Sequence, residues 1–296
     1  MRSTIILATL ALLFSACDTA TTANESLRLS FSSIDPLANG FHYEGWAIIN
    51  GEPFSTGKFN VDASGDLIQL DGTPIPNGTF NTSRDLSLAS AIVITIEPDG
   101  DTDTSPSTTK FMGGDLSGQS ASLATGHGSS LGDDFSSADG VYVLATPTDG
   151  SGTNENSGIW FLDLSSGSPA PGLTLPDLPD GWKYEGWSVI NGTPVTTGTF
   201  TSVTGADEAA PFSGPQPGPP FPGEDFLTNA PPGLTFPTDL AGGMAVLSIE
   251  PFPDDDPAPF TLKPLVAQIP TDATDHTVYG LGNNASAFPT GTAIVD

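Results

Sequence analysis

Residues 43–59 read YEGWAIINGEPFSTGKF, and residues 184–200 repeat the pattern as YEGWSVINGTPVTTGTF. A copied stretch of this length indicates an internal duplication. Each copy is typical of a β-hairpin, because aromatic and β-branched residues lead into an Asn-Gly pair that suits a type I′ turn. The predicted turn residues are Asn50 and Gly51 in the first copy, and Asn191 and Gly192 in the second.

The two faces of the first arm differ in character. The period of two places Trp46 and Ile48 on one face, and the small residue at position 47, which is Ser188 in the second copy, is expected to point outward. Glu44, repeated as Glu185, shares the face of the tryptophan. We expect it to be a strand-end carboxylate that reaches solvent or a backbone N–H. The alternative is a buried acid with a raised pKa, because burial disfavours the charged form.

The composition favours an all-β chain. The 296 residues include 34 Gly and 28 Pro, and short apolar runs separated by Gly, Pro, Asn and Asp clusters are typical of strands and turns. The strongest runs, 91–96 and 244–249, each end in Glu-Pro. The length suits two domains of ordinary size. We therefore predict two tandem β-sandwich-like domains that arose from the duplication.

The expected boundaries follow the repeat. The first domain spans residues 27–150 and closes with a strand at 141–145, and residues 151–157 form a polar linker. The second domain spans residues 158–296, closes with a strand at 293–295, and carries a Pro-rich insert at about 205–230.

The charge is strongly negative. Seven basic residues against 35 acidic ones give a net charge of −28. Such a field repels phosphate backbones, so the composition argues against nucleic-acid binding and against docking on anionic lipid.

The amino terminus resembles the signal of a bacterial lipoprotein. Arg2 precedes an apolar run at 5–14, which is too short for a transmembrane helix, and small residues precede Cys17, the only cysteine. Leu13 to Cys17 resembles a lipobox, although Phe14 stands where Leu is usual. The resemblance implies a signal peptide at 1–16, lipidation of Cys17 and a flexible tether at 17–26. It also implies a location in the cell envelope, on the extracytoplasmic side of a bacterial membrane.

The ordered motifs of each half resemble the extracytoplasmic C-terminal domain of anti-sigma-K-type factors. That family has a Trp-containing strand, a Pro…Gly-x-Phe strand and a Glu-Pro…Pro loop. The matching positions in the first copy are Trp46, Pro53, Gly57, Phe59, Glu97, Pro98 and Pro106. Those in the second copy are Trp187, Pro194, Gly198, Phe200, Glu250, Pro251 and Pro259.

Two departures limit what this resemblance implies. The sequence has no His…Cys-x-x-Cys zinc helix domain that would hold a sigma factor, and no transmembrane helix pattern. We therefore expect only the outer part of such a protein, duplicated and lipid-anchored, which acts as a sensory or binding module.

Several residues could carry chemistry. Asp99, Asp101 and Asp103 have the spacing of the first calcium ligands of an EF-hand loop, but Thr104 stands where the loop needs Gly, so a solvated turn is the preferred interpretation. Glu97 with Lys110, and Glu250 with Lys263, recur together and predict a cross-strand ion pair in each domain.

The remaining candidates are weaker. His42, His127 and His276 are all expected to lie on the surface or in loops, because three scattered histidines without a Cys partner make no recognisable metal set. Lys183 is the counterpart of His42 in the second copy. Trp160 and Trp182 could stack on sugars, but core packing is the preferred interpretation.

Three functions stay open at this point. The first is a non-catalytic envelope protein that binds an unknown protein or ligand and needs no cofactor. The second is a calcium- or carbohydrate-binding surface protein. The third is a hydrolase, which requires two carboxylates that face each other across a cleft.

Overall fold

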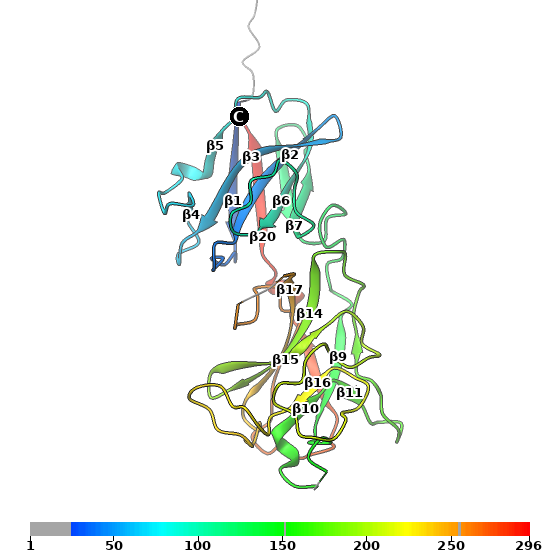
Figure 1. Cartoon of the computed structure of the whole chain (residues 1–296). Coiled ribbons are helices and arrows are strands. Elements are labelled where there is room, and N and C mark those ends of the chain that lie inside the picture. Colours follow the sequence, from blue (N-terminus) through cyan, green and yellow to red (C-terminus); the bar gives the residue numbers. More distant parts are fainter. Residues whose placement is uncertain (1–24, 151, 254–255) are drawn as a thin grey trace, which may run out of the picture.

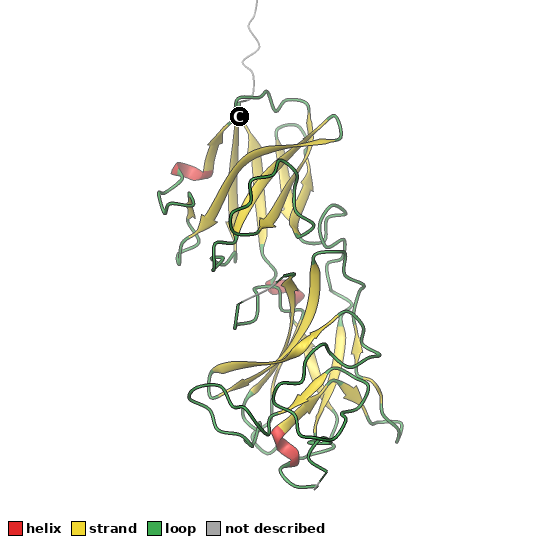
Figure 2. Cartoon of the chain, viewed as in Figure 1, coloured by secondary structure: helices red, strands yellow, loops and turns green. Residues whose placement is uncertain are grey.

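The computed structural model describes residues 25–150, 152–253 and 256–296. Within these ranges the chain forms strands and three short 3-10 turns, and no α-helix (Figure 2). The described residues contain no helix long and apolar enough to span a membrane. The signal peptide, Cys17 and most of the tether predicted from the sequence lie outside the described residues. The all-β prediction with two large sheets is confirmed.

The first domain is a nine-stranded sheet in the order β4-β3-β2-β6-β7-β8-β20-β1-β5 (Figure 1). Its strands are β1 (Ser26–Ser32), β2 (His42–Ile49), β3 (Glu52–Val61), β4 (Leu67–Ile68), β5 (Thr79–Asn81), β6 (Ala89–Glu97), β7 (Lys110–Asp115), β8 (Ser120–Ala124) and β20 (Thr290–Val295). The turn η1 (Pro76–Gly78) precedes β5.

The second domain repeats this arrangement in the order β15-β14-β17-β18-β19-β9-β10-β16, with β13 paired to β9. Its strands are β9 (Asp139–Leu144), β10 (Gly158–Trp160), β13 (Leu173–Thr174), β14 (Trp182–Ile190), β15 (Thr193–Phe200), β16 (Gly223–Asp225), β17 (Met244–Pro251), β18 (Leu265–Gln268) and β19 (Tyr279–Asn283). A small ribbon joins β11 (Leu162–Asp163) to β12 (Ala170–Pro171), and the turns are η2 (Glu155–Ser157) and η3 (Ala285–Ala287).

Each sheet curls so that its two halves enclose a core. The rings of Phe31 on β1 and Phe59 on β3 stack at 5.8 Å, although these strands are far apart in the sheet order. A methyl group of Leu29 on β1 likewise lies against Gly45 on β2. The two halves therefore face each other as the layers of a sandwich do.

The duplicated hairpins form as the sequence predicts. Asn50 and Gly51 have φ values of 54° and 83°, and Asn191 and Gly192 have 53° and 82°. Both central residues of a type I′ turn need positive φ, so the Asn-Gly pairs set this turn. Each hairpin also contains a bulge beside its tryptophan, where the register shifts.

The expectation that position 47 points outward was wrong. Tyr43, Ala47 and Ile49 belong to the hydrophobic core, and position 47 is fully buried, as is Ser188 in the second domain. Trp46 lies on the opposite face and is still only 1% exposed. The strand is thus buried on both faces, and alternation alone does not reveal which face meets the core.

The closing strands are exchanged between the two copies. β9, predicted to close the first domain, pairs with β10 and β19 of the second sheet. β20, predicted to close the second domain, pairs with β1 and β8 of the first sheet. The corrected second domain spans β9 to β19 and is inserted between β8 and β20 of the first.

Chain connectivity explains this exchange. β9 ends at Leu144 and β10 begins at Gly158, so the antiparallel pair of Ile159 with Leu144 closes a short loop. Neighbouring strands pair often, because the closure of a short loop costs little entropy. Residues 152–157 of the predicted linker therefore lie inside the second domain, and the predicted insert contributes β16 to its edge.

The two domains pack against each other through aromatic and loop residues. The ring of Phe111 on β7 lies 5.7 Å from the ring of Phe260, which also contacts Trp182 on β14. Thr109 donates a hydrogen bond to the carbonyl oxygen of Gly181. One continuous hydrophobic cluster accordingly runs through both domains.

Candidate functional site

A hydrogen-bonded triad of a tryptophan, a hydroxyl residue and a glutamate recurs in both domains. In the first domain, Trp46 Nε1 donates to Thr95 Oγ1 at 2.9 Å, and Thr95 donates to Glu97 Oε1. The amide of Ser107 also donates to this oxygen, at 3.0 Å. Because the glutamate connects the end of β6 to the loop that follows, this triad has a structural role.

The second domain contains the same triad with one substitution. Trp187 Nε1 donates to Ser248 Oγ at 2.8 Å, and Ser248 donates to Glu250 Oε1. The amide of Phe260 takes the place of Ser107 and donates to Glu250 at 2.9 Å. The Glu-Pro motif of the repeat therefore marks a buried carboxylate that fixes a loop.

These contacts replace the ion pair predicted for the first domain. Glu97 is 2% exposed and turns toward Thr95, whereas Lys110 is exposed at the start of β7. In the second domain burial lowers the pKa of Lys263, and the charges of Asp35 and Glu250 act in the opposite direction. The sequence did not reveal the roles of Thr95 and Ser248. Each precedes its glutamate by two residues, and ordinary strand alternation places any two such residues on the same face.

Glu44 is a buried acid, so the alternative interpretation of this residue is confirmed. It is 2% exposed, and burial raises its pKa, although the hydrogen bond from Ser55 and the charge of Lys58 act in the opposite direction. Its counterpart Glu185 accepts a hydrogen bond from Thr196.

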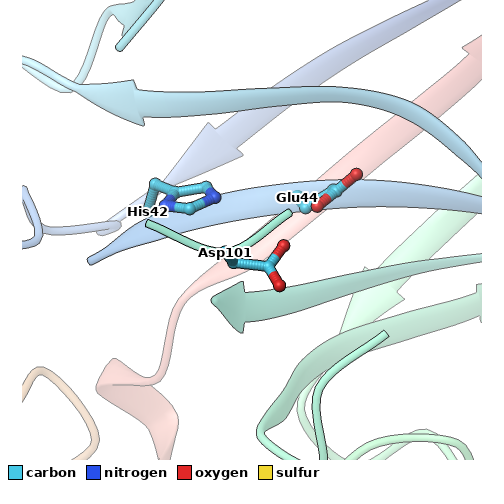
Figure 3. Close-up of side chains that lie close together, drawn as sticks. All are labelled: His42, Glu44 and Asp101. Carbon is cyan, nitrogen blue, oxygen red and sulfur yellow. The ribbon is translucent and has the colours of Figure 1, made fainter. Parts of the chain in front are cut away.

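Three side chains of the first domain converge near the end of β2. His42 and Glu44 lie on this strand, and Asp101 comes from the loop after β6 (Figure 3). One ligand atom of each lies within 4.8 Å of the other two. An imidazole and two carboxylates at this separation are a possible ligand set for a divalent metal ion.

Lys58 on β3 supplies the positive charge at this cluster. Its Nζ lies 2.7 Å from Asp101 Oδ2 and 3.7 Å from Glu44 Oε2, and it also donates to the Asp101 carbonyl oxygen at 2.8 Å. Burial lowers the pKa of Lys58, but the hydrogen bond to Asp101 and the charge of Glu44 outweigh it. The hydrogen bond from Lys58 lowers the pKa of Asp101.

The calcium loop considered from the sequence does not assemble. Asp101 turns toward Lys58, Asp99 packs on Gly40, and Asp103 accepts the amide of Ser105 at 2.7 Å. Among the described residues, the carboxylates of these three aspartates do not converge within ligand distance. The spacing of Asp residues reflects turns closed by side chain to backbone hydrogen bonds.

Two of the three histidines lie in loops as expected, but the expectation was wrong for His42, which is 3% exposed on β2. His127 contacts Ser129 and Asp115, and His276 is exposed in a loop beside Asp275 and Glu155. Trp160 and Trp182 are at most 4% exposed, which confirms core packing over a sugar platform.

Three further acids lie close together in the second domain. Burial raises the pKa of Asp207 and of Glu224 to about 7, and it also raises the pKa of Asp225. Glu224 accepts from Ser213 and from the amide of Asp225, at 3.0 Å in the second case. The sequence did not single out this group, because acids are frequent throughout the chain.

Comparisons with protein-family models, curated proteins and solved structures find no match to this chain.

Proposed function

We propose that this chain is a non-catalytic, lipid-anchored binding module of a bacterial cell envelope. The amino-terminal pattern around Cys17 and the resemblance of each half to the extracytoplasmic domain of anti-sigma-K-type factors support this role. The net charge of −28 argues against nucleic acid as the partner. A protein or small ligand of the envelope is the expected partner.

The observation that carries the proposal is the position of the chain ends. The Ser26 amide donates to the Asp296 carbonyl oxygen at 3.2 Å, and the C-terminus lies at the end of the first domain that is remote from the second (Figure 1). Ser26 follows Cys17 by nine residues, an extended length of about 30 Å. An anchor at Cys17 therefore holds the first domain near the membrane and presents the second domain outward.

The two repeated strand-end acids have a structural role. Glu97 and Glu250, the two strand-end acids, accept hydrogen bonds from a neighbouring hydroxyl and a loop amide. Carboxylates used in this way stabilise loops. The loops that they fix lie where the two domains meet, since Phe260 contacts Phe111.

Lipidation is tested by expression of the full chain and its Cys17→Ser variant in a bacterium supplied with an alkyne-tagged fatty acid. We expect label and membrane fractionation for the natural chain, and neither for the variant. Ser15→Ala keeps both Cys17 and a small residue before it, so it serves as the matched control and is expected to keep the label. A Cys17→Ser chain that keeps the label would refute the anchor.

The binding role is tested separately, by crosslinking in intact cells and mass spectrometry of the captured proteins and ligands. We expect one envelope component to be enriched with the anchored chain and depleted with Cys17→Ser. Equal recovery of all components with both chains would contradict the proposal that the anchor positions a binding module.

A further inference from the structure

The cluster of His42, Glu44 and Asp101 contains two polar atoms that lack hydrogen bonds. His42 is 3% exposed and Glu44 is 2% exposed. His42 Nε2 and Glu44 Oε2 are buried and have no hydrogen-bond partner. Glu44 Oε2 has only the ammonium group of Lys58 nearby, at 3.7 Å. A buried polar atom without a hydrogen bond is costly, so these two atoms in one cluster indicate a site for a ligand.

The tautomer of His42 suits metal binding. Its Nδ1 lies 3.3 Å from the carbonyl oxygen of Gly40. A carbonyl oxygen can only accept, so Nδ1 carries the hydrogen of this bond, and in the neutral imidazole Nε2 then keeps its lone pair. Histidines that bind metal ions through one nitrogen commonly donate from the other to a carbonyl or carboxylate.

The ligand set selects the class of ion. An imidazole nitrogen with two carboxylate oxygens suits zinc and similar transition ions, whereas calcium takes six to eight oxygen ligands. Zinc–ligand distances of about 2.0–2.2 Å place the ligand atoms of a tetrahedral site about 3.3 Å apart. The present 4.8 Å limit therefore requires small side-chain movements.

The ammonium group of Lys58 lies beside the two carboxylates, where a bound metal ion would otherwise lie. The side chain of Lys58 is 27% exposed, so the ammonium group can turn into solvent when a metal ion takes its place. Asp101 also lines a cavity of about 280 Å³ between the domains, together with Phe41 and Phe252. One of the three proposed ligand residues therefore borders open space.

The second domain shows that the cluster is particular to the first. At the positions of His42 and Lys58 it has Lys183 and Thr199. Lys183 Nζ donates to Glu208 at 2.7 Å and lies 3.9 Å from the centre of the Phe252 ring. One copy thus carries a fixed lysine at this position of the strand, and the other an imidazole with a free nitrogen.

We propose that His42, Glu44 and Asp101 bind one divalent transition-metal ion of the zinc class, which displaces the ammonium group of Lys58. The fourth position of the ion is left to water or to an external ligand. The ion replaces one positive charge by two beside two carboxylates, which offsets the negative field of the first domain.

The proposal is tested with the full chain in detergent, by equilibrium dialysis against zinc and measurement of the bound metal. We expect one tightly bound ion for the natural chain and its loss in His42→Ala. Lys58→Met removes the competing cation and is expected to tighten zinc binding by about tenfold or more. His276→Ala, in the exposed cluster with Glu155 and Asp275, is the matched control and keeps the tight ion.

Two further measurements make the result decisive. Circular dichroism of each variant establishes that it is folded, and the visible spectrum of bound cobalt reports an imidazole ligand without reliance on activity. If His42→Ala does not fold, Asp101→Asn replaces it, with the same expected loss of zinc. Zinc bound equally by the natural chain and the folded His42 or Asp101 variant would overturn the proposal, as would loss of the ion in His276→Ala. A failure of both the natural chain and folded Lys58→Met to bind zinc would also overturn it.

Discussion

Glu224→Gln is expected to stabilise the second domain at about pH 8 and to give no advantage at about pH 4. Glu224 is fully buried on β16, and burial raises its pKa from 4.5 to about 7. The unfolded chain releases this proton at a lower pH than the folded chain does. Stability therefore falls as the pH rises from 4.5 to 7, and the full cost is present above that window.

The magnitude follows from the shift. Each pKa unit corresponds to about 1.4 kcal/mol, so ionisation of Glu224 costs the fold at most about 3.5 kcal/mol at pH 8. Glutamine avoids this cost, but its NH₂ group cannot accept from the Phe212 amide, which lies 3.4 Å from Glu224 Oε2. That loss is about 1 kcal/mol, which leaves a net gain of at most about 2.5 kcal/mol.

The assay is urea denaturation followed by circular dichroism at several pH values between about 4 and 8. Glu208→Gln is the control of opposite sign, because the hydrogen bond from Lys183 lowers the pKa of Glu208. The ionised carboxylate of Glu208 stabilises the fold above the pKa that this group has in the unfolded chain, and this stabilisation is lost as the pH falls. Glu208→Gln is therefore less stable than the natural chain at pH 8. The reasoning is refuted if the stability difference between Glu224→Gln and the natural chain is the same at every pH.

Two other substitutions test the fold by urea denaturation. Thr95→Val is expected to lower the free energy of unfolding by about 2 kcal/mol, because it leaves the indole N–H of Trp46 and the carboxylate of Glu97 without their shared partner. An unchanged urea midpoint would contradict the structural role of this triad. Val295→Ala, at a residue 2% exposed on the exchanged strand, is expected to cost about 2 kcal/mol in the first domain. Ile294→Val, on the partly exposed face, is its control and should cost less.

Local sequence signals predicted the parts of the fold that depend on local physics. The Asn-Gly turns form because both central residues tolerate positive φ, and the runs at 91–96 and 244–249 become β6 and β17. The exchange of β9 and β20 was missed because the expected boundaries followed the repeat. The short loop between β9 and β10 favours their pairing, and this places β9 in the second sheet and leaves the edge of β8 to β20.

The candidate site was predictable only in part. His42 and Glu44 are two residues apart on a strand, so their side chains share a face, and this signal was available. Asp101 reaches them through the loop after β6, and no local pattern gives that placement. The expectation that Glu44 reaches solvent failed because Ser55 and Lys58, on the paired strand, cover its carboxylate.

The order of synthesis follows from the exchanged strands. β8 ends at Ala124 and its neighbour β20 begins at Thr290, so the ribosome makes the whole second domain before the first sheet is complete. The first domain is therefore completed last, and until β20 is made it lacks the strand that lies between β1 and β8. A nascent chain halted within that interval exposes two unpaired strand edges, which are the surfaces through which aggregation starts and to which chaperones bind.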